Sequence, residues 1–142
     1  MNKQQALPIN SPQAIEQALA GKTIAVVGLS SNPQSPSHGV AAYLQGQGYR
    51  IIPVNPHEQV ILGERVYPSL RDIPEPVDVV DIFRRADAVP GIVDDAIAIG
   101  APLVWMQLGI VNQEAADHAQ AAGITVVMDH CMRVEHRARH EG

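Results

Sequence analysis

The chain has 142 residues, and its 46% hydrophobic and 18% charged content predicts a globular protein. Its net charge of −5 counts against binding to nucleic acid or to anionic lipid. Aromatic residues make up 4% and there is one cysteine, which excludes a base-stacking platform and an intramolecular disulfide. No apolar run could span a bilayer and the N-terminus lacks the apolar stretch of a signal peptide, so we expect a cytoplasmic protein with no membrane contact.

Helical and strand patterns alternate along the chain, separated by short connections. Ser11-Pro12 predicts the start of a leading helix that ends at Gly21, because serine is a common N-cap and proline is favoured in the first turn. The following elements are expected as strand 23–27, helix from about 38 to 46, strand 50–55, a short strand around Val66, a helical turn 69–73, strand 77–83, helix 88–99, strand 103–107, helix 112–122, strand 124–128 and a last helix ending near residue 139.

This alternation predicts an α/β fold of the Rossmann-like, doubly wound class. We expect a mostly parallel sheet of five to six strands with helices on both faces. Residues 1–142 are expected to form a single domain, with the helix in residues 1–21 packed on it. Pro53 lies within a strand pattern and should be at an edge or a bulge, because proline donates no ladder hydrogen bond.

The segment from Gly28 to Ser37 is the strongest candidate for a ligand-binding loop. It follows a buried strand, is rich in Gly, Ser, Asn and Pro, and leads to a helix that Ser37 is expected to cap near His38. Outward-facing amides at such a helix N-terminus favour a phosphate group. The loop lacks the dinucleotide pattern G-x-G-x-x-G, because the next glycine after Gly28 is Gly39, and it has no P-loop Gly-Lys-Ser/Thr.

Other polar segments should reach the same crevice at the C-terminal ends of the strands. Asn55 follows the second strand where an NAD site prefers a carboxylate, which counts against NAD and leaves room for a ribose phosphate, as in NADP or coenzyme A. Asn55-Pro56 is equally consistent with a simple turn. Arg84 and Arg85 follow a strand end and are expected either to bind ligand phosphates or to be solvated.

The remaining polar candidates favour structural roles. Asp78 and Asp81 interrupt a strand pattern and are expected to cap neighbouring elements or to face an edge, rather than to form an acid–base pair. His136 and His140 are spaced for metal binding, but the sequence offers no complete ligand set, and we expect solvated histidines and no metal. Cys131 is expected to be structural, with reactivity as a thiol left open.

Several motifs in fixed order carry a family resemblance. These are residues 26–33 (VVGLSSNP), 54–56 (VNP), 67–73 (YPSLRDI), 77–84 (VDVVDIFR), 104–109 (VWMQLG) and 129–131 (DHC). Together they resemble the small stand-alone CoA-binding proteins of bacteria, which are similar to the N-terminal CoA-binding domain of the succinyl-CoA synthetase α subunit. The resemblance covers the chain from about Lys22 to its end.

The resemblance implies where parts of coenzyme A would lie. The loop would hold the pyrophosphate, Asn55 and Pro56 would lie by the adenosine, Phe83 and Arg84 would border the adenine and 3′-phosphate, and the segment from Gln107 to Gly109 would line the floor toward the pantetheine. The expected cofactor-binding residues are Gly28, Leu29, Ser30, Ser31, Asn32, Ser37, His38, Asn55, Pro56, Phe83, Arg84, Arg85, Gln107 and Gly109.

The sequence thus predicts a protein that binds coenzyme A or an acyl-CoA without catalysis of its own. The histidine that the synthetase phosphorylates belongs to a second domain, so the resemblance transfers no ligase chemistry and no catalytic residue. Two alternatives remain: an NADP- or NAD-dependent oxidoreductase or redox sensor, and an accessory subunit of an acyl-CoA ligase or transferase. A homodimer or partner chain is left open. Cys131, at the ligand end of the last strand, is a candidate redox thiol toward coenzyme A.

Overall fold

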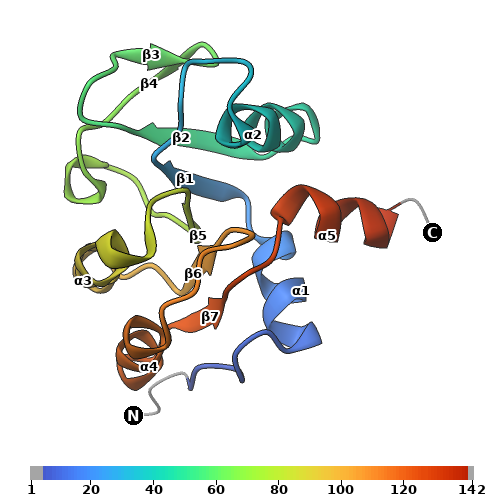
Figure 1. Cartoon of the computed structure of the whole chain (residues 1–142), viewed down its shortest axis with the longest axis vertical. Helices are drawn as coiled ribbons and strands as arrows, with labels where there is room; N and C mark the ends of the chain where they lie inside the picture. Colours follow the sequence, from blue (N-terminus) through green and yellow to red (C-terminus); the bar gives the residue numbers. More distant parts are fainter. Residues whose placement is uncertain (1–4, 141–142) are drawn as a thin grey trace.

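The computed structural model describes residues 5–140 and has a parallel sheet at its centre (Figure 1). The strands are ordered β2-β1-β5-β6-β7, and each neighbouring pair is parallel. The elements are α1 (Pro12–Ala20), β1 (Thr23–Val27), α2 (Pro36–Gly46), β2 (Arg50–Val54), β3 (Val60–Ile61), β4 (Glu64–Arg65), η1 (Leu70–Asp72), β5 (Val79–Ile82), η2 (Ala86–Ala88), α3 (Val89–Ile99), β6 (Leu103–Met106), α4 (Gln113–Ala121), β7 (Thr125–Val127) and α5 (Met132–His140).

Helices cover both faces of the sheet and bury two separate cores. On one face, α1, α2 and α5 pack on alternate strand residues such as Ile24 and Val26. On the other, α3 and α4 pack on the intervening residues, such as Ala25 and Val27. Successive side chains of a strand point to opposite faces, so strands that are apolar throughout supply both cores. The predicted Rossmann-like α/β fold is confirmed.

The strand order reverses between β1 and β5. From β1 the chain crosses through α2 to the edge strand β2, and it returns to pair β5 with the other side of β1. Pro53 lies on that edge strand, as the sequence predicts. In such sheets a crevice opens at this reversal, outside the C-terminal ends of the strands. The residues that follow β1 and β5 therefore face a natural ligand-binding position.

Two predicted local features are wrong. The N-cap of α2 is Ser35 rather than Ser37, because Pro36 occupies the first turn, the same Ser-Pro pattern that begins α1. The expected short strand near Val66 is the two-stranded hairpin β3–β4, outside the main sheet, so the main sheet has five strands.

Among residues 5–140, no helix has both the length and the apolar character needed to cross a membrane.

Candidate functional site

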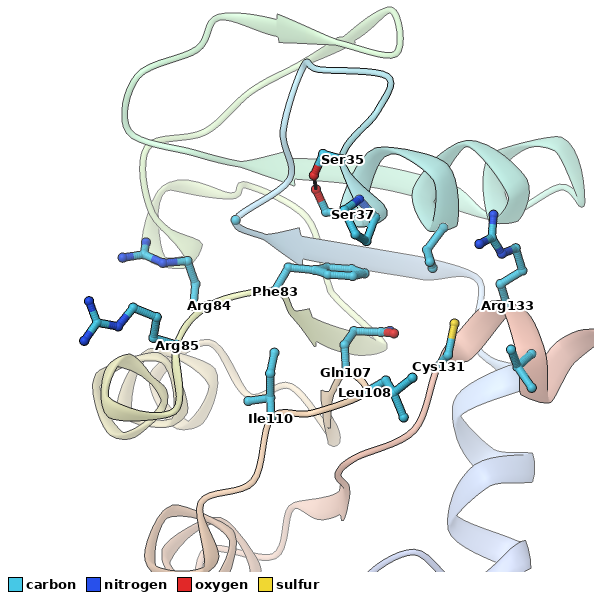
Figure 2. Close-up of a pocket in the computed structure, with 14 residues that line it drawn as sticks. Ser35, Ser37, Phe83, Arg84, Arg85, Gln107, Leu108, Ile110, Cys131 and Arg133 are labelled. Carbon is cyan, nitrogen blue, oxygen red and sulfur yellow. Dashed lines mark hydrogen bonds between the residues drawn. The ribbon is translucent and has the colours of Figure 1, made fainter.

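A pocket of about 720 Å³ opens at the C-terminal ends of β1, β5 and β6 (Figure 2). Its walls come from the loop after β1, the segments after β5 and β6, and the start of α5. This volume is within the range of small-molecule and cofactor sites. The lining residues are Gly28, Ser35, Pro36, Ser37, Val40, Phe83, Arg84, Arg85, Gln107, Leu108, Ile110, Cys131, Arg133 and Val134.

Gly28 is required by the close approach of two chain segments at the point where the strand order reverses. Its φ is 85°, and a Cβ there would collide with the carbonyl oxygen of Phe83 and lie 2.8 Å from Cδ of Arg84. The Gly28 amide donates to the Val54 carbonyl at 2.9 Å. Glycine thus lets the loop leave β1 directly against the end of β5, which brings the loop and Phe83 to one pocket.

The loop after β1 satisfies many of its own amides. The buried Ser37 accepts a hydrogen bond at Oγ from the Ser30 amide at 3.0 Å, Ser30 Oγ accepts from the Asn32 amide at 3.0 Å, and Asn32 accepts from the Gln34 amide at 2.9 Å. The Ser35 amide donates to the Asn32 carbonyl. The expectation of several outward-facing amides is therefore wrong at these four positions, and Ser37 orders the loop instead of capping α2.

Three arginines surround the pocket. Arg84 and Arg85 extend from the end of β5 on one side, and Arg133 rises from α5 toward α2 on the other (Figure 2). Arg85 contacts Asp87 at 3.4 Å, and because both side chains are exposed this ion pair contributes little to stability. Arg84 and Arg133 make no ion pair with any residue among 5–140. The pocket thus carries a local positive charge on a chain of net negative charge.

Gln107 and Asp81 form a buried pair at the base of the pocket. Nε2 of Gln107 donates to Oδ1 of Asp81 at 2.6 Å, and the exposed fractions of the two residues are 3% and 0%. Asp81 pairs with Val26 and Trp105 on the neighbouring strands, so it lies inside the sheet and not at an edge. Burial raises the pKa of Asp81 to about 7, and the hydrogen bond from Gln107 opposes that rise. The expectation that Asp81 faces an edge is wrong.

Asp78, by contrast, has the predicted capping role. Its Oδ2 accepts hydrogen bonds from the amides of Lys22 and Thr23 at 2.8 and 2.9 Å. These amides begin β1, so Asp78 joins the N-terminal ends of β5 and β1, opposite the pocket.

Cys131 lines the pocket and is partly buried. It lies in the segment between β7 and α5, and the adjacent carbonyl of His130 accepts a hydrogen bond from Nε1 of Trp105 at 2.8 Å. The buried Trp105 therefore fixes the backbone of this segment from inside the sheet. The result is a thiol held at the wall of the pocket.

The C-terminal histidines are not both solvated. His136 is 4% exposed, its Nδ1 lies 2.7 Å from the Tyr43 hydroxyl, and its ring stacks on His140 at 4.0 Å. Burial lowers the pKa of His136, and His140 adds to this effect. The prediction of a solvated His136 is wrong because α5 packs on α2 through these rings. Among residues 5–140, no three His, Cys, Asp or Glu side chains are grouped so as to hold a metal ion.

Comparison with known proteins identifies the family. Residues 22–137 match the CoA binding domain. The chain belongs to this family. The protein YneT of Bacillus subtilis is 44% identical over 115 residues, which cover 81% of this chain and 85% of YneT. A solved protein of Pyrococcus horikoshii covers the whole of both chains with 35% identity and a TM-score of 0.87.

This CoA-binding domain is also related to a larger enzyme. The ADP-forming acetate–CoA ligase II of Archaeoglobus fulgidus is 35% identical over 81 residues, which cover 56% of this chain and 12% of the ligase. The similarity therefore involves a small part of the ligase.

The pocket of this CoA-binding domain brings together some expected residues and leaves others apart. Gly28, Ser37, Phe83, Arg84, Arg85 and Gln107 line it, together with the candidate thiol Cys131. The expected residues outside its lining are Leu29, Ser30, Ser31, Asn32, His38, Asn55, Pro56 and Gly109. Of these, Leu29 is buried, Ser31 donates to Glu58 at 2.9 Å, and the Gly109 amide donates to Asp129 at 2.8 Å.

Asn55 and Pro56 line a second pocket of about 460 Å³ beside the β3–β4 hairpin. Nδ2 of Asn55 donates to the Leu29 carbonyl at 3.0 Å, and its Oδ1 accepts from the His57 amide at 2.8 Å. Both ends of this side chain thus bind the protein itself. Its role in the fold is to hold the loop after β1 against the end of β2.

About half of the lining was not singled out as expected binding residues. These residues are Ser35, Pro36, Val40, Leu108, Ile110, Arg133 and Val134. Ser35 and Pro36 lie within the expected loop 28–37, and Leu108 lies within the expected floor segment 107–109, whereas no signal in the sequence indicated Val40, Arg133 and Val134. Arg133 and Val134 follow Cys131 closely, but only the packing of α5 on α2 brings them to the pocket.

Proposed function

We propose that this protein binds coenzyme A, or an acyl-CoA, in the pocket at the C-terminal ends of β1, β5 and β6, and that it catalyses no reaction of its own. The observation that carries the proposal is the placement of a pocket of about 720 Å³ between arginines, in a domain of the CoA-binding family. Coenzyme A carries several phosphate charges on one end and a long pantetheine arm on the other. The pocket offers cations at its mouth and an apolar wall.

The two parts of the ligand match two parts of the pocket. Arg84, Arg85 and Arg133 are suited to phosphate groups, because guanidinium donors form charge-assisted hydrogen bonds with phosphate oxygens. Val40, Leu108, Ile110 and Val134 supply apolar surface for the methylene and gem-dimethyl groups of the arm, and Phe83 with Arg84 remains the candidate border of the adenine and 3′-phosphate. In this proposal the loop residues 28–32 and the first turn of α2, with Ser37 and His38, border the pyrophosphate, and Asn55 and Pro56 remain candidates for adenosine contact.

Isothermal titration with coenzyme A, acetyl-CoA, dephospho-CoA, NADP and NAD tests the proposal. Coenzyme A should bind, dephospho-CoA should bind more weakly, and the nicotinamide dinucleotides should not compete. Arg84→Gln should weaken coenzyme A binding roughly tenfold, the order expected for a hydrogen bond to a charged group. Arg71→Gln is the matched control, because Arg71 pairs with Asp95 at 2.7 Å and does not line the pocket.

Binding of NADP without binding of coenzyme A would overturn the proposal in favour of a nicotinamide-dependent protein. The similarity to an acetate–CoA ligase favours a second candidate, an accessory role beside an acyl-CoA ligase. A native mass spectrum of freshly purified protein separates the two: a binding module carries the ligand alone, and an accessory subunit carries a second chain.

A further inference from the structure

Asp81 is a carboxylic acid buried inside the sheet, directly behind the pocket. Its Oδ1 accepts from Nε2 of Gln107 at 2.6 Å, and its Oδ2 has no hydrogen-bond partner among the described residues. Burying a carboxyl group with one oxygen unpaired is costly, and such groups are rare in folded proteins. The strand β5 is buried on both faces of the sheet, so the protein would be more stable with an apolar side chain in place of Asp81. The acid therefore calls for an explanation beyond packing.

The contact with Gln107 supplies that explanation. Gln107 follows β6 and lines the pocket, and its polar end points into the space between Phe83 and Cys131 (Figure 2). A glutamine amide has a donating NH₂ end and an accepting oxygen end, and the group that binds one end decides which end is left for a ligand. A carboxylate can only accept. Asp81 therefore binds the NH₂ end of Gln107 and leaves its oxygen for the pocket.

We propose that Asp81 is a positioning residue of the pocket: by holding Nε2 of Gln107, it presents Oε1 of Gln107 as the acceptor for an N–H group of the ligand. Oε1 accepts no hydrogen bond from any residue among 5–140. An oxygen at the base of a largely apolar pocket selects for a donor at that depth, because an unpaired polar group inside the complex would reduce affinity. The pKa of Asp81, raised to about 7, leaves the carboxylate available above that pH.

This inference rests on the proposed function and extends it to the pantetheine arm. The arm of coenzyme A carries two amide N–H groups, whereas adenosine 3′,5′-bisphosphate has the phosphates and base without the arm. A hydrogen-bond acceptor for the pantetheine arm therefore changes the affinity for coenzyme A and leaves the affinity for adenosine 3′,5′-bisphosphate unchanged. The ratio of the two affinities therefore reports the hydrogen bond from Gln107, and a general loss of structure would change both affinities together.

The test compares these two ligands by titration at about pH 8 on three variants. Asp81→Leu removes the carboxylate at similar size and should weaken coenzyme A roughly three- to tenfold, the range of one neutral hydrogen bond, with adenosine 3′,5′-bisphosphate unchanged. Asp81→Asn keeps an oxygen that accepts from Nε2 and should restore most of the affinity. Asp78→Asn is the control, because Asp78 is an acid immediately before the same strand, and it accepts from the amides of Lys22 and Thr23 and does not contact Gln107.

A second measurement does not depend on the folding of any variant. Coenzyme A analogues in which each arm amide is replaced in turn by an ester lack one N–H group, and one of them should bind the unaltered protein roughly three- to tenfold more weakly than coenzyme A. Equal affinity of both esters and coenzyme A would overturn the inference, as would equal weakening of both ligands by Asp81→Leu. Failure of the unaltered protein to bind coenzyme A would instead overturn the proposed function.

Discussion

Asp81 lies between Val26 of β1 and Trp105 of β6, in the middle of the sheet, although its polarity suggests an exposed position. An acid in a strand pattern is normally a sign of an edge, because burial of an unpaired charge is expensive. The pairing with Gln107 changes this outcome. Gln107 is 26 residues away and belongs to the next strand segment, so no local pattern around Asp81 contains that information.

The raised pKa of Asp81 predicts a particular dependence of stability on pH. In the unfolded chain the carboxyl titrates near 3.8, and in the native protein near 7, so between these values the native state holds a proton that the unfolded state has released. The free energy of unfolding should therefore fall by up to about 1.4 kcal/mol per pH unit across that window, and this contribution should level off above about pH 7.

Urea unfolding followed by the fluorescence of the buried Trp105 measures this effect. The stability of the unaltered protein minus that of Asp81→Asn should decrease from about pH 4.5 to about pH 7 and stay constant above it. The asparagine variant removes the titrating group at nearly constant shape. A difference that does not change across this range would show that the carboxyl keeps its ordinary pKa in the folded protein.

At the scale of elements, the segment between β7 and α5 links the interior of the sheet to the pocket. Nε1 of Trp105 holds the His130 carbonyl, and α5 then packs its His136 on Tyr43 of α2. Cys131, Arg133 and Val134 reach the pocket because this helix is anchored at both places. Without these two contacts, a short helix with as many charged residues as α5 would be expected to be solvated and to lie away from the pocket.

The position of Cys131 predicts thiol–disulfide exchange with coenzyme A disulfide. The Cys131 thiolate would attack one sulfur of the reagent, form a new S–S bond to it and release the other half as a coenzyme A thiolate. Intact mass after treatment should show one coenzyme A attached to the unaltered protein and none attached to Cys131→Ser. Excess adenosine 3′,5′-bisphosphate should slow the reaction if the pocket guides it. An unmodified wild-type protein would show that Cys131 is an inert part of the wall.

At the scale of the whole molecule, the pocket lies where the two halves of the sheet diverge. The loop after β1 and the segments after β5 and β6 arrive from elements that belong to both cores. A ligand that contacts all of these segments binds the native state and not the unfolded chain. Its binding free energy therefore adds to the stability of the entire fold.

Thermal unfolding should consequently shift when coenzyme A is present. At a concentration 100 times its Kd, the ligand should add about 2.7 kcal/mol, which corresponds to a rise in Tm of roughly 9 °C for a chain of this size. Arg84→Gln should reduce the rise at the same ligand concentration, and Arg71→Gln should preserve it. An equal rise with NAD would contradict a pocket that is specific for coenzyme A.

The amino-acid sequence by itself determined the fold class, the family and the strand ends that meet at the pocket. These properties follow from local signals: apolar runs for the buried strands, Ser-Pro and Asn112 at helix starts, Gly100 at a helix end, and motifs in fixed order. The confirmed Rossmann-like fold then fixes the crevice, because parallel strands joined by crossovers end at one edge.

Only the tertiary structure decided which side chains have free atoms at that crevice. The loop after Gly28 hydrogen-bonds several of its own amides, which the sequence pattern alone would leave available to a ligand. Asn55 binds this loop instead of facing the pocket, and Arg133 reaches the pocket from α5. Each outcome depends on a partner from another element, such as Ser37 for Ser30 or Gln107 for Asp81. Hydrogen bonds between distant segments are decided by packing, and packing has no signature within a short stretch of sequence.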